Sequence, residues 1–195
     1  MLIMTYDTET TGFPLYKEPS EDPRQPHIVE LAALLFDDAT GELVEQMHAI
    51  VRPDGWEIPE EATAIHGITT EFALDKGRPE AEVLAEFLAL HDLAMLRVAH
   101  NEDFDQRIVR IAIKRLGAGA TQEERDTIAD AFKAAPKYCT MKADAKARGV
   151  KWPKLVEAYK HHTGKDLGED AHSALFDARA CAEVYFAMNP ARSAA

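Results

Sequence analysis

Residues 1–14 read MLIMTYDTETTGFP, a short apolar segment followed by two acids, two threonines and a glycine. The apolar residues leave little polar face, which predicts a buried central strand over residues 2–7. Because side chains alternate along a strand, Asp7 and Glu9 are expected to project to the same face. Two carboxylates at the end of a core strand cost free energy unless something compensates them, and a hard divalent cation such as Mg²⁺ or Mn²⁺ does so.

The composition is that of an ordinary globular protein. The chain has 195 residues, of which 46% are hydrophobic and 29% charged, enough for one domain, or for one domain with an appendage. It lacks an eighteen-residue apolar run and the features of a secretory signal, so we expect a cytoplasmic protein with no membrane partner. Two cysteines, Cys139 and Cys181, suit neither a disulfide framework nor a zinc site and are expected to be buried, inert thiols.

Charge is unevenly distributed along the chain. The net charge of −12 argues against non-specific nucleic-acid binding by the protein as a whole. Residues 133–165, however, carry nine Lys/Arg against two acids, a local charge of +7. This basic segment is either a solvated face or a surface that faces phosphates, and the sequence leaves both readings open.

The remaining pattern predicts an α/β protein. Four prolines make residues 13–26 a loop, and two apolar runs around the turn-forming DDATGE predict a hairpin within residues 27–53. Together with the first strand this hairpin gives an antiparallel three-stranded meander. Residues 54–69 read as another loop, and MLRVAHN at 95–101 as a short strand. Helices are expected over residues 79–91, 103–116, 122–134, 141–148 and 153–162, and from Asp170 or Ser173 to Met188.

A second group of acids follows the strand at residues 95–101. The sequence VAHNEDFDQRI passes from strand to helix, and the ends of strands in α/β sheets are where functional sites are usually built. Asp103 and Asp105 both compete for a functional role. The alternative for each is a charge that favours the helix dipole at its N-terminus.

The third group lies in EDAHSALFDARACAEVY, residues 169–185. His172 and Asp177 are five residues apart, which on one helix separates them by about 140° around the axis. If both serve one site, His172 should precede the helix, with Ser173 as a candidate N-cap. Taken alone, His172 is more often a surface or capping residue.

Read in order, these motifs resemble the DEDDh branch of the DnaQ-like 3′→5′ exonucleases. The three family motifs correspond to DTETTG, HNEDFD and HSALFDA, and IHGIT at residues 65–69 also matches. CTM at residues 139–141 is similar to the exodeoxyribonuclease ten type, whereas the proline-rich loop looks longer than is usual in the family. The resemblance implies an RNase H-like mixed sheet, with the meander, parallel strands and flanking helices, in a single exonuclease domain over residues 1–188 and a short tail over 189–195.

The resemblance also implies the catalytic residues. Two divalent cations, Mg²⁺ or Mn²⁺, would be held by Asp7, Glu9, Asp105 and Asp177, and His172 would act as general base. This assignment is the reason to prefer Asp105, and Asp103 is then left as a helix-capping residue.

Further residues would bind the 3′-terminal nucleoside by the same resemblance. These are Thr10, Thr11, Gly12, Ile65, His66, Asn101 and Phe104. Phe104 could equally belong to the core and His66 could satisfy a turn. An apolar side chain, Ile65 or Ile68, would be suited to wedge between the last bases.

The expected reaction is hydrolysis of phosphodiester bonds from the 3′ end of DNA, at single-stranded ends, with release of nucleoside 5′-monophosphates. RNA 3′-end trimming, as in RNase T and oligoribonuclease, is the alternative substrate class. A non-catalytic, polymerase-associated nucleic-acid binding subunit is the alternative of another class. Only NPARSAA follows the last expected helix, which favours a free-standing nuclease over a dedicated proofreading subunit, with a polymerase or repair protein as a possible partner. The sequence does not define the oligomeric state.

Overall fold

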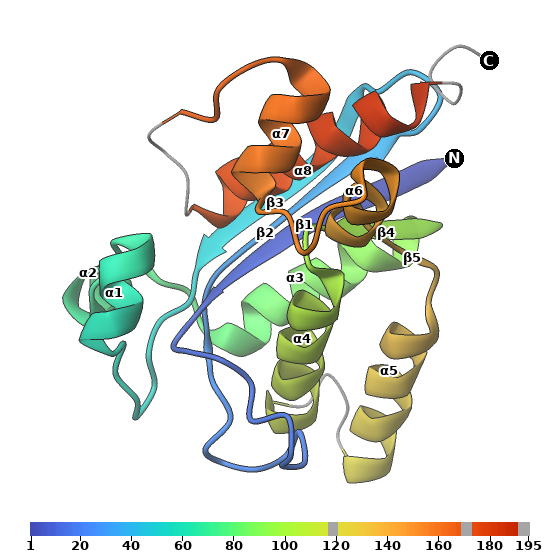
Figure 1. Ribbon diagram of the computed structural model, residues 1–195. Coiled ribbons are helices and arrows are strands. Elements are labelled where there is room, and N and C mark those ends of the chain that lie inside the picture. Colours follow the sequence, from blue (N-terminus) through green and yellow to red (C-terminus); the bar gives the residue numbers. More distant parts are fainter. Residues whose placement is uncertain (117–120, 169–172, 191–195) are drawn as a thin grey trace.

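The protein folds around one mixed five-stranded sheet (Figure 1). The computed structural model describes residues 1–116, 121–168 and 173–190. The strand order is β3-β2-β1-β4-β5, in which β1–β2 and β2–β3 are antiparallel while β1–β4 and β4–β5 are parallel. The strands are β1 (Leu2–Thr10), β2 (Ile28–Asp37), β3 (Leu43–Ile50), β4 (Leu96–Ala99) and β5 (Lys137–Cys139). The predicted meander with added parallel strands is confirmed.

Helices cover both faces of this sheet. Figure 1 shows α6, α7 and α8 on one face and α3, α4 and α5 on the other, while α1 and α2 lie beyond one end of β1 and β2. The helices are α1 (Glu60–His66), α2 (Thr70–Lys76), α3 (Glu80–Leu93), α4 (Glu102–Leu116), α5 (Gln122–Ala134), α6 (Thr140–Arg148), α7 (Leu155–Thr163) and α8 (Ala174–Met188). No helix in the described ranges is both long and apolar enough to cross a bilayer.

Alternation along β1 divides the core into two layers. Ile3 is fully buried against residues of α8, whereas Met4 and Tyr6 are fully buried in the cluster that also contains Phe87 of α3. Because β1 lies at the centre of the sheet, both of its faces are covered, which explains its nearly continuous apolar sequence. Successive residues at its end therefore point alternately toward α8 and toward the α3–α4 layer.

A buried ion pair joins β4 to the start of α4. The guanidinium of Arg97 donates to a carboxylate oxygen of Glu102 at 2.8 Å, and the hydroxyl of Tyr6 donates to the same oxygen at 3.2 Å. Lys137 of β5 contacts the other oxygen of Glu102 at 2.8 Å. Since removing one partner of such a pair strands a buried charge, this network fixes the first turn of α4 against the sheet.

The structure corrects four details of the predicted elements. The strand predicted over residues 2–7 continues to Thr10, and the predicted loop over residues 54–69 contains α1. That helix has only seven residues between Pro59 and Gly67, whose φ of 75° is left-handed, so its periodicity is too short to recognise. The strand β5 and the helix α2 were not predicted; β5 has three residues.

The two cysteines are free thiols, as expected. Cys181 is buried on α8, where burial raises the pKa of its thiol and keeps it protonated. Cys139 is only half-buried, so the expectation of burial holds for Cys181 alone.

Candidate active site

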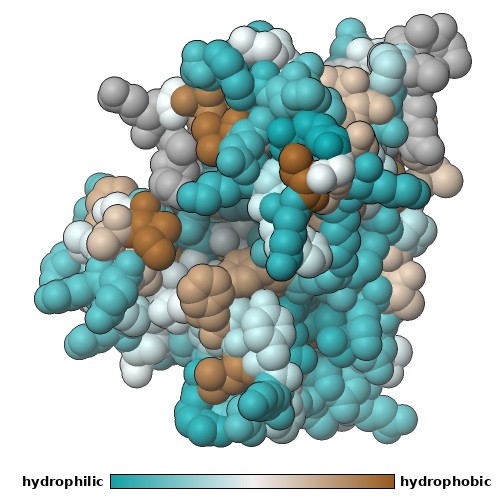
Figure 2. All heavy atoms as spheres, viewed as in Figure 1, coloured by the Kyte–Doolittle hydropathy of each residue, from teal (hydrophilic) through white to brown (hydrophobic). Residues whose placement is uncertain are grey.

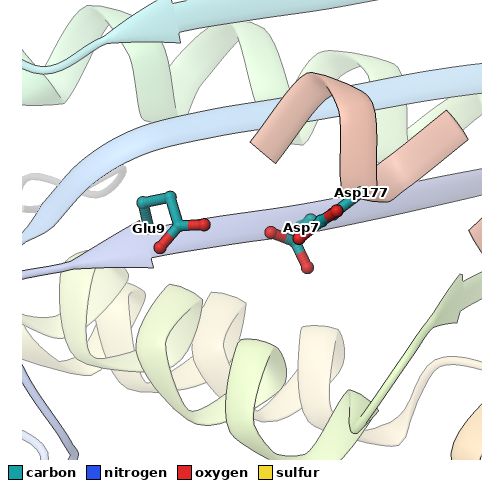
Figure 3. Close-up of side chains that lie close together, drawn as sticks. All are labelled: Asp7, Glu9 and Asp177. Atoms are coloured by element: carbon teal, nitrogen blue, oxygen red, sulfur yellow. The ribbon is translucent and has the colours of Figure 1, made fainter. Parts of the chain in front are cut away.

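Three of the four predicted metal-binding acids meet at the centre of the sheet. Asp7 and Glu9 project from one face of β1, and Asp177 approaches them from α8 (Figure 3). One carboxylate oxygen of each residue lies within 4.8 Å of those of the other two, and all three residues are half-buried. Since α8 packs on the same face of β1 as Asp7 and Glu9, the alternation of the strand brings Asp177 to them.

Asp105, the fourth predicted acid, comes from the opposite face of β1. It lies in the first turn of α4 and is only 2% exposed. Its Oδ1 accepts hydrogen bonds from the Thr8 backbone N–H at 3.1 Å and from the Thr8 hydroxyl at 2.8 Å. Thr8 points away from Asp7 and Glu9, so the acids surround the end of β1 from both sides, with Asp105 outside the three-residue cluster.

Mutual repulsion and burial raise the proton affinity of these acids. Burial raises the pKa of Asp7 well above its usual value, and the charges of Asp105 and Asp177 raise it further. The pKa of Glu9 rises to about 8, chiefly through burial and then through the charge of Asp177. Burial raises the pKa of Asp105 to about 7, against the hydrogen bonds from Thr8 that lower it. A divalent cation relieves this repulsion, and the all-oxygen donor set suits Mg²⁺ or Mn²⁺.

His172, the predicted general base, lies outside the described residues. The helix that follows it begins at Ala174, and Ser173 occupies the N-cap position as predicted, although its side chain does not cap the helix. Instead, Glu30 of β2 accepts from the Ala174 N–H at 2.8 Å and from the Ser173 hydroxyl at 3.3 Å. A buried carboxylate thereby fixes the first turn of the helix that carries Asp177.

Glu30 is a functional-site residue that the sequence analysis missed. It is buried, pairs in register with Glu9 on the neighbouring strand, and contacts the imidazole of His48 at 2.6 Å. Its charge contributes to the raised pKa of Glu9. The signal available in the sequence was a single acid inside the apolar run IVELAALLF, which costs free energy without a partner.

A cavity of about 460 Å³ opens beside Glu9. In Figure 2 the brown and tan atoms near α1 and near the middle of the face border a hollow. Of the residues predicted to bind the terminal nucleoside, all but Asn101 line this cavity: Thr10, Thr11, Gly12, Ile65, His66 and Phe104. Its size and apolar walls suit a small, flat organic group.

The floor of the cavity is a segment of backbone held in place by threonine hydroxyls. The Thr10 hydroxyl donates to the carbonyl of Gly12 at 2.8 Å, and the Thr11 hydroxyl accepts from the N–H of His27 at 2.9 Å. Gly12 has a φ of 153°, which side-chain-bearing residues rarely adopt. The segment following Glu9 is thus a specific structure and not a simple turn.

Aromatic and aliphatic side chains form the cavity walls. Phe104 of α4 packs edge-on against Phe13, with ring centroids 6.0 Å apart, and Phe13 itself is 79% exposed. Ile65 of α1 is exposed on the other side, and Nδ1 of His66 accepts from the N–H of Ile68. Phe13 was not predicted because it begins the proline-rich loop, where the sequence gives no periodicity.

Two residues that the sequence analysis singled out lie outside both the acidic cluster and the cavity. Asn101 has a left-handed φ of 73°, which asparagine tolerates, and it is exposed at the turn between β4 and α4 instead of lining the cavity. Asp103, expected to cap a helix, forms ion pairs with Lys137 at 3.0 Å and with Lys142. These pairs lower the pKa of Asp103 and occupy part of the basic segment.

The fold and the site together define a class of protein. An RNase H-like sheet with Asp7, Glu9 and Asp177 clustered at its centre, and Asp105 beside them, is the arrangement of the DEDDh, DnaQ-like 3′→5′ exonucleases. A family model for exonucleases, RNase_T, matches residues 4–185. The chain therefore belongs to this exonuclease family.

Curated relatives agree with this assignment. The DNA polymerase III PolC-type of Thermotoga petrophila is 32% identical over 185 residues, which cover 92% of this chain and 11% of that protein. An exonuclease designated CP81 from Escherichia phage 186 is 32% identical over 180 residues, covering 89% of this chain and 80% of the phage protein. The chain thus spans about a tenth of the length of the PolC-type relative and most of the phage protein.

Solved structures share the fold. Exonuclease X in complex with 5′-overhanging duplex DNA superposes with a TM-score of 0.65 at 24% identity, covering 97% of this chain and 92% of the other. The nuclease domain of 3′hExo, a DEDDh family member bound to rAMP, gives a TM-score of 0.68 at 16% identity with the same coverage. At these identities the likeness establishes the fold.

Proposed function

We propose that this chain removes nucleotides from the 3′ end of DNA, preferring single-stranded ends, and releases nucleoside 5′-monophosphates. The observation that carries the proposal is the cluster of Asp7, Glu9 and Asp177 oxygens within 4.8 Å of one another, next to an apolar cavity. An acidic cluster alone repels a polyanion. With divalent cations bound, the local charge reverses and a phosphodiester is attracted instead.

Asp7, Glu9 and Asp177 are suited to hold a pair of Mg²⁺ or Mn²⁺ ions, with Asp105 contributing from its position beside Thr8. When bound, such a pair activates water and shields charge on the phosphate and on the departing oxygen. The raised pKa values of Glu9 and Asp105 support this assignment, because four acids this close need a compensating positive charge.

The chain's own residues would position the terminal nucleotide and accept a proton from the attacking water. The apolar walls formed by Phe13, Phe104 and Ile65 would take the terminal base, and the backbone of residues 10–12 would contact its sugar. His172, directly before the N-cap of α8, would accept the proton of the attacking water, since an imidazole titrates near neutral pH. Asn101, exposed at the end of β4, would contact the strand outside the cavity.

DNA is favoured as substrate by the relatives. One is a DNA polymerase III of PolC type, and Exonuclease X was solved with duplex DNA. A polymerase or repair protein is accordingly the expected partner, with proofreading or repair as the process. Trimming of RNA 3′ ends is the alternative favoured by a specific observation, since 3′hExo was solved with rAMP. A non-catalytic binding subunit is less consistent with the presence of Asp7, Glu9, Asp105 and Asp177 together.

We further propose that residues 1–188 act as one exonuclease domain, followed by a short segment over 189–195. The described elements support this division, because one sheet carries every strand from β1 to β5 and α8 ends at Met188.

A nuclease assay tests the proposed activity. Single-stranded DNA and RNA of one sequence, both labelled at the 5′ end, are incubated with the protein and Mg²⁺, Mn²⁺ or EDTA. The proposal requires a metal-dependent ladder that shortens from the 3′ end, with DNA degraded faster. Asp7→Ala should abolish the ladder, whereas Asp103→Ala, an exposed acid of α4 paired with lysines, should retain it.

His172→Ala tests the general base separately. We expect turnover to fall by about 10²- to 10⁴-fold while Mn²⁺ binding, measured by calorimetry, is largely retained. Unchanged turnover would remove this role from His172, and an active Asp7→Ala variant would overturn the metal-dependent mechanism.

A further inference from the structure

The loop between α6 and α7 presents a strained and exposed tryptophan. Trp152 is 57% exposed and has a φ of 49°, a conformation that bulky residues rarely adopt. It also precedes a proline, Pro153, which normally favours an extended conformation in the residue before it. Strain of this kind persists only where the surrounding structure fixes it, and it is a frequent property of ligand-contacting segments.

A histidine at the end of β4 anchors this loop. Nε2 of His100 contacts the carbonyl oxygen of the buried Pro153 at 2.9 Å, and its Nδ1 contacts the Thr140 hydroxyl at 2.9 Å. The imidazole therefore links the turn after β4, the start of α6 and the loop. Trp152 is held one residue from this anchor, with its ring on the surface.

The anchor attaches the loop to the end of β4, the strand that pairs with β1. In the parallel pairing of β1 with β4, Thr5 lies opposite Val98, and His100 follows Val98 by two residues, just past the end of β4, as Asp7 follows Thr5 on β1. Neighbouring strands are about 4.8 Å apart. Figure 1 shows the loop above the N-terminal end of α4, the helix that carries Asp105.

Exposed lysines flank the tryptophan in the sequence. Lys151 and Lys154 flank it in the loop and are exposed, and Lys146 is exposed on α6. The lysines nearer the sheet, Lys137 and Lys142, are already paired with Asp103. The two loop lysines thus place positive charge beside an aromatic ring, in a loop attached to the end of β4.

We propose that Trp152 stacks on a base of the single-stranded substrate on the 5′ side of the scissile bond, while Lys151 and Lys154 face its phosphates. An aromatic ring among cations is the usual device for holding a single strand without sequence preference, because every base has a π-face. This inference rests on the proposed nuclease function. It assigns part of the basic segment to substrate binding.

Two substrates of different length test the proposal. One is a single-stranded oligothymidylate of twelve nucleotides, and the other is the p-nitrophenyl ester of thymidine 5′-monophosphate, which occupies only the site of hydrolysis. Trp152→Ala should raise KM for the oligonucleotide about five- to hundredfold and leave ester hydrolysis unchanged. Trp152→Phe should retain most of the affinity. Val150→Ala, another exposed apolar residue of the same loop, is the matched control and should change neither.

The role of the loop lysines is tested separately, through the salt dependence of KM. Replacing Lys151 or Lys154 by alanine should reduce the salt dependence of log KM for the oligonucleotide by about 0.7 for each phosphate that the variant no longer neutralises. Unchanged slopes for both variants would contradict the assignment of these lysines to the phosphates.

The outcomes separate this proposal from the function on which it rests. Normal ester hydrolysis with an unchanged oligonucleotide KM in Trp152→Ala overturns the stacking, as does an equal loss on both substrates. If the wild-type protein hydrolyses neither substrate, the proposed function fails. Stacking is then decided by whether the oligothymidylate, with Ca²⁺ present, quenches tryptophan fluorescence in the wild type and fails to do so in Trp152→Phe, which retains only Trp56.

Discussion

Crowding of acids at the end of β1 makes the stability of the metal-free protein depend on pH. Glu9 has a folded-state pKa of about 8, against 4.5 for its ordinary value. Between these values the folded protein holds a proton that the unfolded chain has released. The contribution of Glu9 to the free energy of unfolding is therefore fully present below about pH 4.5 and is lost as the pH rises through about 8.

The size of this loss of stability follows from the shift in the pKa of Glu9. A displacement from 4.5 to about 8 corresponds to about 5 kcal/mol at 1.36 kcal/mol per pH unit. Because Glu9 is partly exposed and solvent screens its charge, we expect about half of this, roughly 2 kcal/mol. For a protein of this length, that amounts to a decrease in Tm of about 4–8 °C. Mg²⁺ should restore the loss at pH 8.5 and have little effect at pH 5.5, where protons already neutralise the cluster.

Thermal unfolding followed by circular dichroism, with EDTA or Mg²⁺ at pH 5.5 and pH 8.5, measures this change in Tm directly. Asp7→Asn removes one charge with little change in shape, so it should raise the Tm of the metal-free protein at pH 8.5 and abolish the response to Mg²⁺. Asp103→Asn is the control, because Asp103 is exposed and its pKa is lowered by lysines. Equal Tm values with and without Mg²⁺ at pH 8.5, or a destabilised metal-free Asp7→Asn, would refute the electrostatic reasoning.

Three substitutions test interactions that hold the residues of the candidate active site in place. Thr8→Val removes the 2.8 Å hydrogen bond to Asp105 and should cost about 1–2 kcal/mol in urea denaturation; an unchanged midpoint would contradict the role of that hydroxyl. Arg97→Met removes the buried cation of the pair and leaves only the partly exposed Lys137 beside Glu102, so it should cost about 3–5 kcal/mol by the same measurement, with partial recovery on adding Glu102→Leu. Gly12→Ala meets no atom within 4 Å, so its cost of about 1–2 kcal/mol, measured together with a raised KM, would come from backbone strain alone.

Much of the candidate site was predictable because its motifs are local. Asp7 and Glu9 share a face of β1 by strand alternation, and the spacing of His172 and Asp177 implied a helix that begins after the histidine. The start of that helix at Ala174 agrees with this spacing. The capping box of α5 was equally visible, since Thr121 and Glu124 satisfy it within four residues.

The rest depends on contacts between distant parts of the chain. The hydrogen bonds from Thr8 to Asp105 span 97 residues, and those from Ser173 and Ala174 to Glu30 span more than 140, so no local pattern shows them. The exposed position of Asn101 outside the cavity could not be predicted, because a motif gives a residue's neighbours in sequence and not the direction of its turn.

The contact of Glu30 with the first turn of α8 also bears on how the protein acquires activity. Asp177 reaches Asp7 only when α8 has docked across β1 and β2, so the acidic cluster closes a loop of some 170 residues. Such long-range closure is among the slower steps of folding. Until that helix docks, the sheet presents Asp7 and Glu9 without Asp177. A chain whose sheet has formed but whose α8 has not docked therefore holds an incomplete acidic cluster.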